Sequence, residues 1–247
     1  MAVAGKELEL AIRRYWVERF DLKLRSWEKP GSKLIRDEVF EGSDEIHLYH
    51  LGRQRVLRMD PAKANLIDWP ADMKMRSLDA IDLIPLAGNG ISLSLADGAL
   101  DFYLEPDRFR PARAVEGIEV RRVDSSADDS LLRELVGACS EKDIARAEIY
   151  LDKPDPVIFG GFHGGRMVGY ASHRYWGEMI ADIGVLIHPD FRHRGLGQAI
   201  VSTLCRWCLE NEVIPMYRVE EEHFRSRRIA EALGFDLRVR IEVLRIG

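Results

Sequence analysis

The chain has 247 residues, 46% hydrophobic and 31% charged, so it is long enough for two folded domains and too apolar for extensive disorder. Its net charge of -5 at pH 7 gives no basic surface for nucleic acid, which argues against that class of partner. No apolar run approaches the roughly 20 residues that a membrane span requires, and no signal peptide is evident at the N-terminus, so we expect a cytoplasmic protein that does not contact membranes.

Residues 1–112 predict a small α+β domain whose role the sequence does not specify. Its apolar residues first recur at helical spacing and later alternate with polar residues, as strands do. The expected elements are a helix at 6–22, strands at 45–51 and 54–59, a short helix at 78–83, and a hairpin of 91–95 and 99–104 that turns at Asp97–Gly98. Periodicity is lost between Pro106 and Gly117, where Pro, Arg and Ala accumulate, so we place the domain boundary between residues 112 and 113.

Residues 113–247 predict a second α+β domain. The expected elements are strands at 118–123, 157–162, 167–173, 180–187, 213–219 and 237–244, and helices at 130–139, 144–151, 195–210 and 224–233. Antiparallel strands followed by a strand–helix–strand crossover indicate a central mixed sheet flanked by helices.

The sequence predicts no metal site. Cys205 and Cys208 form a C-x-x-C, but they fall within a predicted helix and lack a second pair of ligands at metal spacing. We expect both to lie on the buried face of that helix. The histidines are scattered along the chain, and no cluster of them is evident.

One strand-to-helix junction carries a pattern that suits an anionic ligand. The predicted strand ends at His188, Pro189 blocks further pairing, and the chain turns directly into a helix. Gly195 and Gly197 permit a tight turn and the close approach of a ligand to the backbone. The first amides of a helix are unpaired and lie at the positive end of its dipole, so they can hold a diphosphate.

The spacing Arg192-x-x-Gly195-x-Gly197 resembles the [QR]-x-x-G-x-[GA] signature of the GNAT superfamily of acyl-CoA N-acyltransferases. The resemblance extends from about Ile118 to Ile246, and Ser226–Phe235 is similar to the family's closing helix. It implies a GNAT-like mixed sheet and acetyl-CoA as cosubstrate. Within the superfamily, the chain is most similar to a branch that has an extra N-terminal domain.

The resemblance also implies a CoA site. The main chain of Val185, Leu186 and Ile187 would pair with the pantetheine arm. The diphosphate would be held by the backbone amides of Arg192, His193, Arg194, Gly195, Leu196 and Gly197. Family members commonly have an asparagine where this chain has His223, which can still donate one hydrogen bond.

The catalytic groups are less well specified. Asp182 lies where many relatives carry an acidic residue and is a candidate general base, but it could instead face solvent or pair with an arginine. Glu221 could recruit a cationic amine or belong only to a charged turn. Ala230 replaces the family's usual tyrosine, which protonates the departing thiolate. Tyr217 could substitute for that tyrosine, or it could be packed in the core.

Two functions therefore remain open. The first is transfer of an acyl group, acetyl by analogy with the superfamily, to a small-molecule or protein amine by direct attack in a ternary complex. The second is a catalytically idle acyl-CoA-binding sensor, which the departures at His223 and Ala230 favour. A homodimer is an open alternative to a monomer, since many such domains pair through terminal strands.

Overall fold

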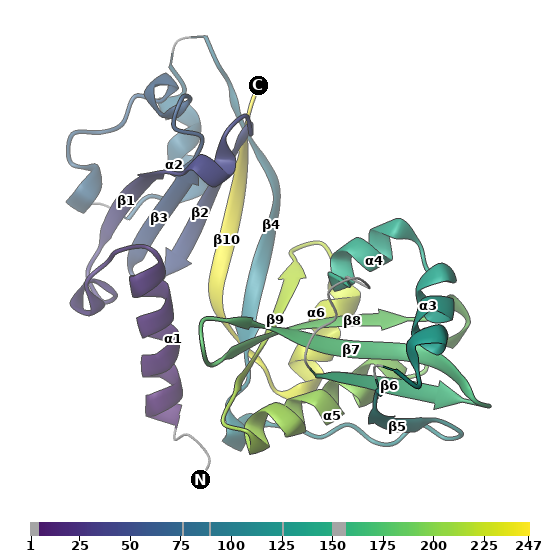
Figure 1. Ribbon diagram of the computed structural model, residues 1–247. Coiled ribbons are helices and arrows are strands. Elements are labelled where there is room, and N and C mark those ends of the chain that lie inside the picture. Colours follow the sequence, from purple (N-terminus) through teal and green to yellow (C-terminus); the bar gives the residue numbers. More distant parts are fainter. Residues whose placement is uncertain (1–4, 76, 89, 125, 150–156) are drawn as a thin grey trace. The chain divides into compact units, whose positions relative to one another are not determined.

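The computed structural model describes residues 5–75, 77–88, 90–124, 126–149 and 157–247 (Figure 1). The chain divides into two compact units, and neither is a single continuous segment. The central unit consists of Met1–Leu8, Tyr103–Arg218 and Arg225–Asp236. The N-terminal unit consists of Glu9–Phe102, Val219–Phe224 and Leu237–Gly247.

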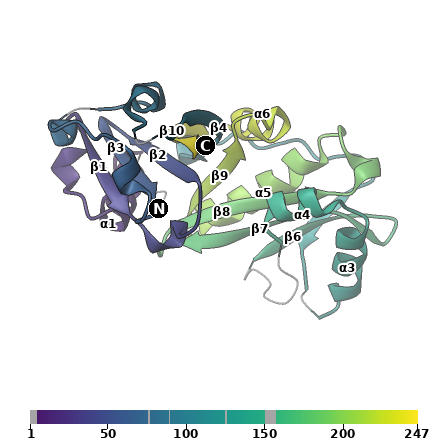
Figure 2. The ribbon, with the colours of Figure 1, turned by 90° about the horizontal axis from the view of Figure 1, so that it is seen from above.

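A mixed sheet with the strand order β9-β8-β7-β6-β5 forms the central unit. Figure 2 shows its strands β9, β8, β7 and β6 in this order. Its elements in chain order are β5 (Glu119–Arg122), α3 (Asp129–Gly137), α4 (Glu141–Ala147), β6 (Ile158–His163), β7 (Arg166–Trp176), β8 (Ile180–Ile187), α5 (Leu196–Glu210), β9 (Ile214–Glu220) and α6 (Phe224–Leu233). The pairs from β5 to β8 are antiparallel, whereas β8 and β9 are parallel. The connection from β8 to β9 therefore crosses over through α5, as a parallel pair requires.

Helices cover both faces of this sheet. On one face, α3 and α4 pack on strand residues such as Phe162, Met167 and Tyr170 in one buried cluster. On the other face, α5 lies so close that a Cβ at Gly161 or Gly169 would meet the Ile200 side chain at 2.8 or 2.5 Å. Both strand glycines therefore allow the close approach of α5.

The N-terminal unit has a sheet with the order β1-β3-β2-β10-β4. The helices and strands that contribute to it are α1 (Gly5–Arg19), β1 (Gly31–Arg36), β2 (Glu45–Leu51), β3 (Gln54–Met59), α2 (Ala80–Leu83), β4 (Leu93–Tyr103) and β10 (Asp236–Ile246). Strand residues such as Ile46, Leu48 and Leu57 share a buried cluster with Leu83 of α2. Tyr49, which alternates with Leu48 along β2, instead contacts Trp16 of α1, with ring centroids 5.7 Å apart.

The predicted α+β class is confirmed. Strands β2, β3 and β8 and helix α6 begin and end at the predicted residues. Strand β1 was not predicted, because Gly31–Arg36 has no clear alternation; it forms through parallel pairing with the whole of β3. The helix predicted at 144–151 has other bounds: α4 begins at Glu141 and ends at Ala147, because Glu148 has a left-handed backbone that caps the helix. Residues 150 and 151 of the prediction lie outside the described residues.

The hairpin predicted around Asp97–Gly98 is wrong, because β4 runs through these residues as one strand. A Cβ at Gly98 would lie 2.3 Å from the carbonyl oxygen of Ile241, so this glycine permits close approach of β10 rather than a turn. The carbonyl of Gly98 also accepts a hydrogen bond from the amide of Glu221 at 2.9 Å. These contacts lie within the N-terminal unit and require β4 to stay extended.

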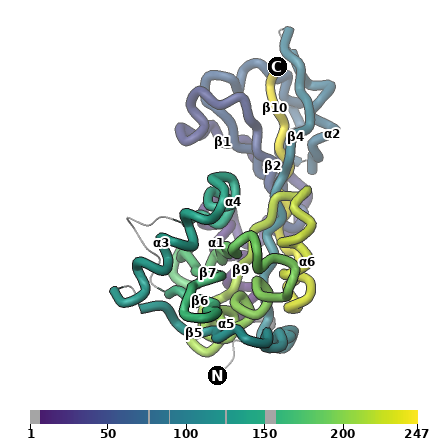
Figure 3. Tube along the Cα trace, turned by 90° about the vertical axis from the view of Figure 1, so that its right-hand side faces the viewer, coloured from purple at the N-terminus to yellow at the C-terminus, as the bar shows by residue number. Residues whose placement is uncertain are grey.

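The division of the chain differs from the expected boundary between residues 112 and 113. The first unit boundary in this region lies between Phe102 and Tyr103, and Leu237–Gly247 returns to the N-terminal unit. The reason for this return is that β10 pairs antiparallel with β2, from Arg240↔His50 to Arg245↔Glu45. Figure 3 shows β10 running beside β4.

None of the helices in the described part of the chain is both long and apolar enough to cross a bilayer.

His173 gives the central unit a predictable response to acid. It is buried on β7 with its ring 5.5 Å from that of Trp207 on α5. Neither ring nitrogen has a well-oriented hydrogen-bond partner among the described residues, although the backbone of Val157 lies close enough to favour the protonated form slightly. Burial therefore lowers the pKa of His173 to about 4.

Because the unfolded chain takes up this proton near pH 6.5 and the folded chain only near pH 4, the stability contributed by neutral His173 is lost as pH falls through this window. We expect a loss of ~3 kcal/mol at pH 4 relative to pH 7 from this residue alone. Urea unfolding at both pH values should show a smaller loss for His173→Gln than for the unchanged chain. The control is His163→Gln, an exposed histidine, which should keep the full loss. An equal loss in the His173 variant would contradict this assignment.

Candidate functional site

Strands β8 and β9 part in the middle of the sheet. They pair only from Ile180↔Ile214 to Asp182↔Met216, whereas the pairing of β8 with β7 continues to Ile187. Among the described residues, no strand pairs with 183–187 on the β9 side. The main-chain groups of this edge, which includes the predicted Val185, Leu186 and Ile187, have no strand partner on the β9 side in the described part of the chain and can pair with an extended ligand, except for the Ile187 carbonyl, which accepts a hydrogen bond from Arg192.

The turn after β8 is fixed by Arg192. Its Nε donates to the carbonyl of Ile187 at 3.1 Å, and its Nη2 to the carboxylate of Asp143 at the start of α4 at 3.1 Å. Its backbone N–H donates to the carbonyl of Pro189 at 3.3 Å. The predicted diphosphate contact of the Arg192 amide therefore competes with a protein partner, since this N–H already bonds Pro189, and the side chain is held by Ile187 and Asp143.

The residues after Arg192 have backbone amides without protein acceptors among the described residues. His193 and Gly195 have positive φ values of 63° and 77°, and the first bond of α5 runs from Ala199 N–H to the Gly195 carbonyl. Within the part of the chain that the structure describes, the N–H groups of 193–198 have no acceptor. Left-handed residues just before a helix turn successive N–H groups toward one concavity, which suits an anion. This segment, residues 193–198, is called the cradle below.

The two glycines of the motif serve different purposes. A Cβ at Gly195 would meet no atom within 4 Å, so this residue is needed for its left-handed backbone and not for space. A Cβ at Gly197 would lie 3.2 Å from Cδ1 of Ile229 on α6 and 3.5 Å from Cγ1 of Ile187. Gly197 therefore lets the start of α5 pack against α6 and the end of β8.

Asp182 lies on the face of the sheet that α4 covers. It is half-buried, and it is directly opposite Arg174 on β7, whose guanidinium donates to the backbone carbonyl of Glu148 at 2.8 Å just after α4. Gly184, two residues along β8, faces the same helix: a Cβ there would lie 2.2 Å from the carbonyl oxygen of Ala147. The arginine expected under the alternative interpretation of Asp182 is therefore present: it is Arg174, directly opposite on β7.

Tyr217 lies on the opposite face. It follows Met216, the last residue of β9 that pairs with β8, and its ring lies 5.9 Å from that of Phe235. Its hydroxyl is buried without a well-oriented partner among the described residues, although Ser226 of α6 is close enough to favour the ionised form slightly. Burial raises the pKa of Tyr217 to about 12, so the phenol is neutral at pH 7.

Two other predicted residues, Glu221 and His223, belong to the N-terminal unit. The carboxylate of Glu221 accepts from Arg240 at 2.9 Å, and its amide donates to Gly98. The amide of His223 donates to the carbonyl of Glu220 at 2.8 Å. Glu221 is thus held in an ion pair in the turn that precedes α6, which agrees with its alternative interpretation as a charged turn.

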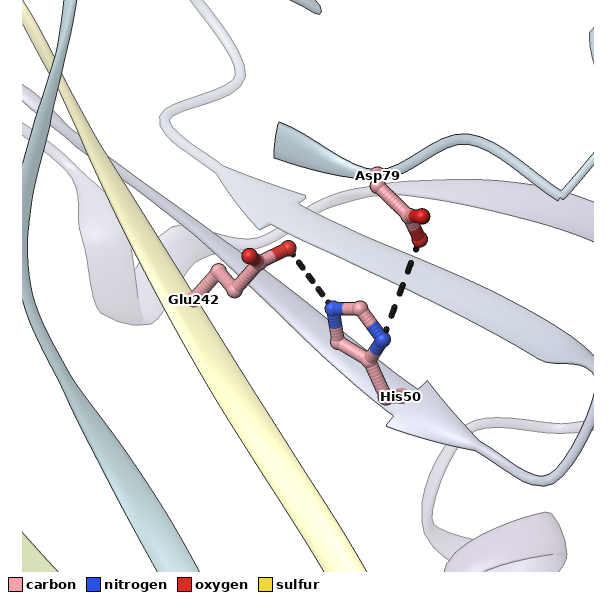
Figure 4. A group of neighbouring side chains, drawn as sticks. All are labelled: His50, Asp79 and Glu242. Atoms are coloured by element: carbon pink, nitrogen blue, oxygen red, sulfur yellow. Dashed lines mark hydrogen bonds and ion pairs between the residues drawn. The ribbon is translucent and has the colours of Figure 1, made fainter. Parts of the chain in front are cut away.

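The N-terminal unit brings together His50, Asp79 and Glu242, which no sequence pattern connects (Figure 4). His50 Nε2 is 2.7 Å from Glu242, and its Nδ1 is 3.9 Å from Asp79. Their ligand atoms are close enough together to bind one metal ion. However, two of these groups already accept hydrogen bonds: the Asp79 oxygen nearest His50 from Arg55 at 3.0 Å, and Glu242 from the Ala80 N–H at 3.1 Å. Burial and the charge of Arg55 lower the pKa of His50. We interpret the cluster as a polar network that ties the start of α2 to the sheet.

The C-x-x-C cysteines are buried on α5, as predicted. Burial raises the pKa of Cys208 to about 12 and that of Cys205 well above its usual value, so neither supplies a thiolate at neutral pH.

Comparison with known proteins agrees with this geometry. Residues 126–235, a little under half of the chain, match the acetyltransferase (GNAT) family. No curated protein matches the chain.

Several solved structures are similar to the chain. A GNAT-family protein from Novosphingobium aromaticivorans shares 18% identity and a TM-score of 0.45, over 65% of this chain and 68% of its own. A GCN5-related N-acetyltransferase from Sphaerobacter thermophilus shares 16% identity and a TM-score of 0.49, over 63% of this chain and 52% of its own. A protein from Salmonella typhimurium, named as an acetyltransferase and solved with its cofactor acetyl-CoA, shares 18% identity and a TM-score of 0.41, over 53% of this chain and 94% of its own.

The chain thus spans only about half the length of the Sphaerobacter protein. The family match covers the part of the chain from α3 to α6. This part contains the unpaired edge of β8, the cradle, Asp182 and Tyr217. The chain therefore carries a domain of the acetyltransferase (GNAT) family in residues 126–235.

Proposed function

We propose that the chain is an N-acyltransferase that transfers an acyl group, acetyl in the simplest case, from acyl-CoA to an amine by direct attack in a ternary complex. The observation that carries the proposal is the coincidence, at the end of one strand, of an unpaired main-chain edge and a row of free amides. An extended, amide-containing arm that ends in a diphosphate matches both features. The family match supports acetyl-CoA as the cosubstrate.

In this proposal, the cradle holds the diphosphate, and the main chain of Val185 to Ile187 pairs with the pantetheine arm. The thioester then lies near Asp182, where β8 and β9 part. Main-chain N–H groups of the unpaired edge could donate to the developing oxyanion. Arg192 contributes by holding the turn between these two parts of the site, through its bonds to Ile187 and Asp143.

Asp182 and Tyr217 would approach the thioester from opposite faces of the sheet. Asp182 would remove a proton from the attacking amine, directly or through a water. Tyr217 would donate a hydrogen bond to the departing thiolate. Because its pKa is raised to about 12, it would stabilise the leaving group mainly as a hydrogen-bond donor and not as a strong acid.

The sensor remains the second candidate, favoured by Ala230, which is buried at the family's usual tyrosine position and can donate no proton. Both candidates bind acyl-CoA, and only the enzyme releases CoA when an amine is supplied. The net charge of -5 favours a cationic small-molecule or protein amine as acceptor. A thiol-release assay across a panel of such amines distinguishes the two functions.

The substitution Asp182→Asn should leave acetyl-CoA affinity unchanged and lower amine-dependent CoA release by about 10²-fold or more, because it removes the proposed base without changing its shape. Calorimetry and the thiol-release assay measure the two effects separately. The control is Asp190→Asn, an exposed carboxylate in the turn after β8, which should keep full turnover. Unchanged turnover of the Asp182 variant would remove this residue from the mechanism.

The substitution Gly195→Val should weaken acetyl-CoA binding at least about tenfold, since a β-branched residue strongly disfavours the left-handed backbone that orients the cradle amides. The matched control is Gly165→Val in the turn between β6 and β7, where φ is 79° and a Cβ also meets nothing within 4 Å. Thermal unfolding should show similar losses of folding stability in the two variants. Calorimetry should show weaker acetyl-CoA binding only in the Gly195 variant. Retained affinity in the Gly195 variant would count against the cradle.

A further inference from the structure

Three arginines around the cradle have no acidic partner. Arg194 in the cradle and Arg225 and Arg228 on α6 are exposed, and none forms an ion pair or hydrogen bond with another described residue. Neighbouring arginines behave differently: Arg192 bonds Asp143, and Arg227 bonds Glu231 at 2.7 Å. The unpaired set is therefore a local excess of positive charge in a chain whose net charge is -5.

Helix geometry places two of these arginines on the flank of α6 next to the cradle. Ile229 marks that flank, because its Cδ1 lies 3.2 Å from the Cβ position of Gly197. Residues advance by about 100° around a helix, so Arg225 lies one turn before Ile229 on nearly the same line, and Arg228 lies farther out on the same side. Buried Ala230 lies on the other side of Ile229, and Arg227 with its partner Glu231 lies beyond it.

This arrangement suits an anion beside the diphosphate but distinct from it. The cradle amides already provide donors for a diphosphate, whereas arginines at i and i+3 on α6 can hold a further phosphate by charge-assisted hydrogen bonds. CoA carries one such group, the 3'-phosphate of its ribose, which is joined to the diphosphate through that same ribose. A cationic acceptor would be repelled from this surface, so the arginines do not suit the amine.

We infer that Arg225 and Arg228 bind the 3'-phosphate of CoA, so that the site selects CoA over carriers that lack this phosphate. The inference rests on the proposed function, since it assumes that the cradle holds the CoA diphosphate. It adds a specificity determinant on α6 that lies outside the glycine motif. Arg194 supplies positive charge to the same region from the cradle side.

The test is calorimetric titration of the full chain with CoA and with 3'-dephospho-CoA. The unchanged chain should bind CoA at least about tenfold more tightly, because the 3'-phosphate contacts are charge-assisted. In Arg225→Gln/Arg228→Gln, both carriers should bind with the affinity that dephospho-CoA has for the unchanged chain. Arg227→Gln is the matched control on the same helix and should keep the tenfold preference.

Raising the salt concentration should reduce the preference of the unchanged chain, since exposed charges are screened. Equal affinity of the unchanged chain for both carriers would overturn the inference and leave the proposed function standing. A double variant that loses the same factor for both carriers would also overturn it, because the arginines would then act on the diphosphate. If neither carrier bound the unchanged, folded chain, the proposed function would be contradicted as well.

Discussion

The parting of β8 from β9 after Asp182 is the constraint on which the proposed site depends. Up to that residue β8 pairs with β9 in parallel, and beyond it β8 pairs only with its antiparallel partner β7. A backbone edge in the middle of a sheet is costly unless something satisfies it, and in a stable fold that partner is water or a ligand. The parting also sets the positions of Asp182 and Tyr217: each lies at the fork, and the alternation of side chains directs them to opposite faces.

The cradle can keep its amides free because other groups satisfy the rest of the turn. Arg192 links the last carbonyl of β8 to the carboxylate of Asp143, and the missing Cβ of Gly197 lets α5 start against Ile187 and Ile229. These contacts come from both faces of the sheet, so the turn is held by α4 and α6 as well as by its own strand and helix. A loop fixed in this way offers its donors without further reorganisation, which favours affinity.

Local patterns predicted much of this arrangement from the sequence. The alternating segments of β2, β3 and β8 depend on neighbouring residues alone and were predicted with the correct ends. The Arg-x-x-Gly-x-Gly spacing is equally local, and the family match agrees with the resemblance drawn from it. Contacts between distant segments were not predictable in this way: Asp97–Gly98 has the composition of a turn, but Gly98 instead makes room for the backbone of β10. The return of β10 to β2, the bond from Arg192 to Asp143 and the polar cluster around His50 likewise join residues far apart in the chain. The sequence of β8 also does not predict the residue at which its pairing with β9 ends.

Amide hydrogen exchange with and without acetyl-CoA tests the central claim most directly, because the proposed ligand contacts are main-chain groups. The account predicts slower exchange at the cradle, residues 193–198, and along 183–187 when acetyl-CoA is present, with little change at the β6–β7 turn at Gly164 and Gly165. Binding of acetyl-CoA without protection of the cradle and the β8 edge would contradict the account.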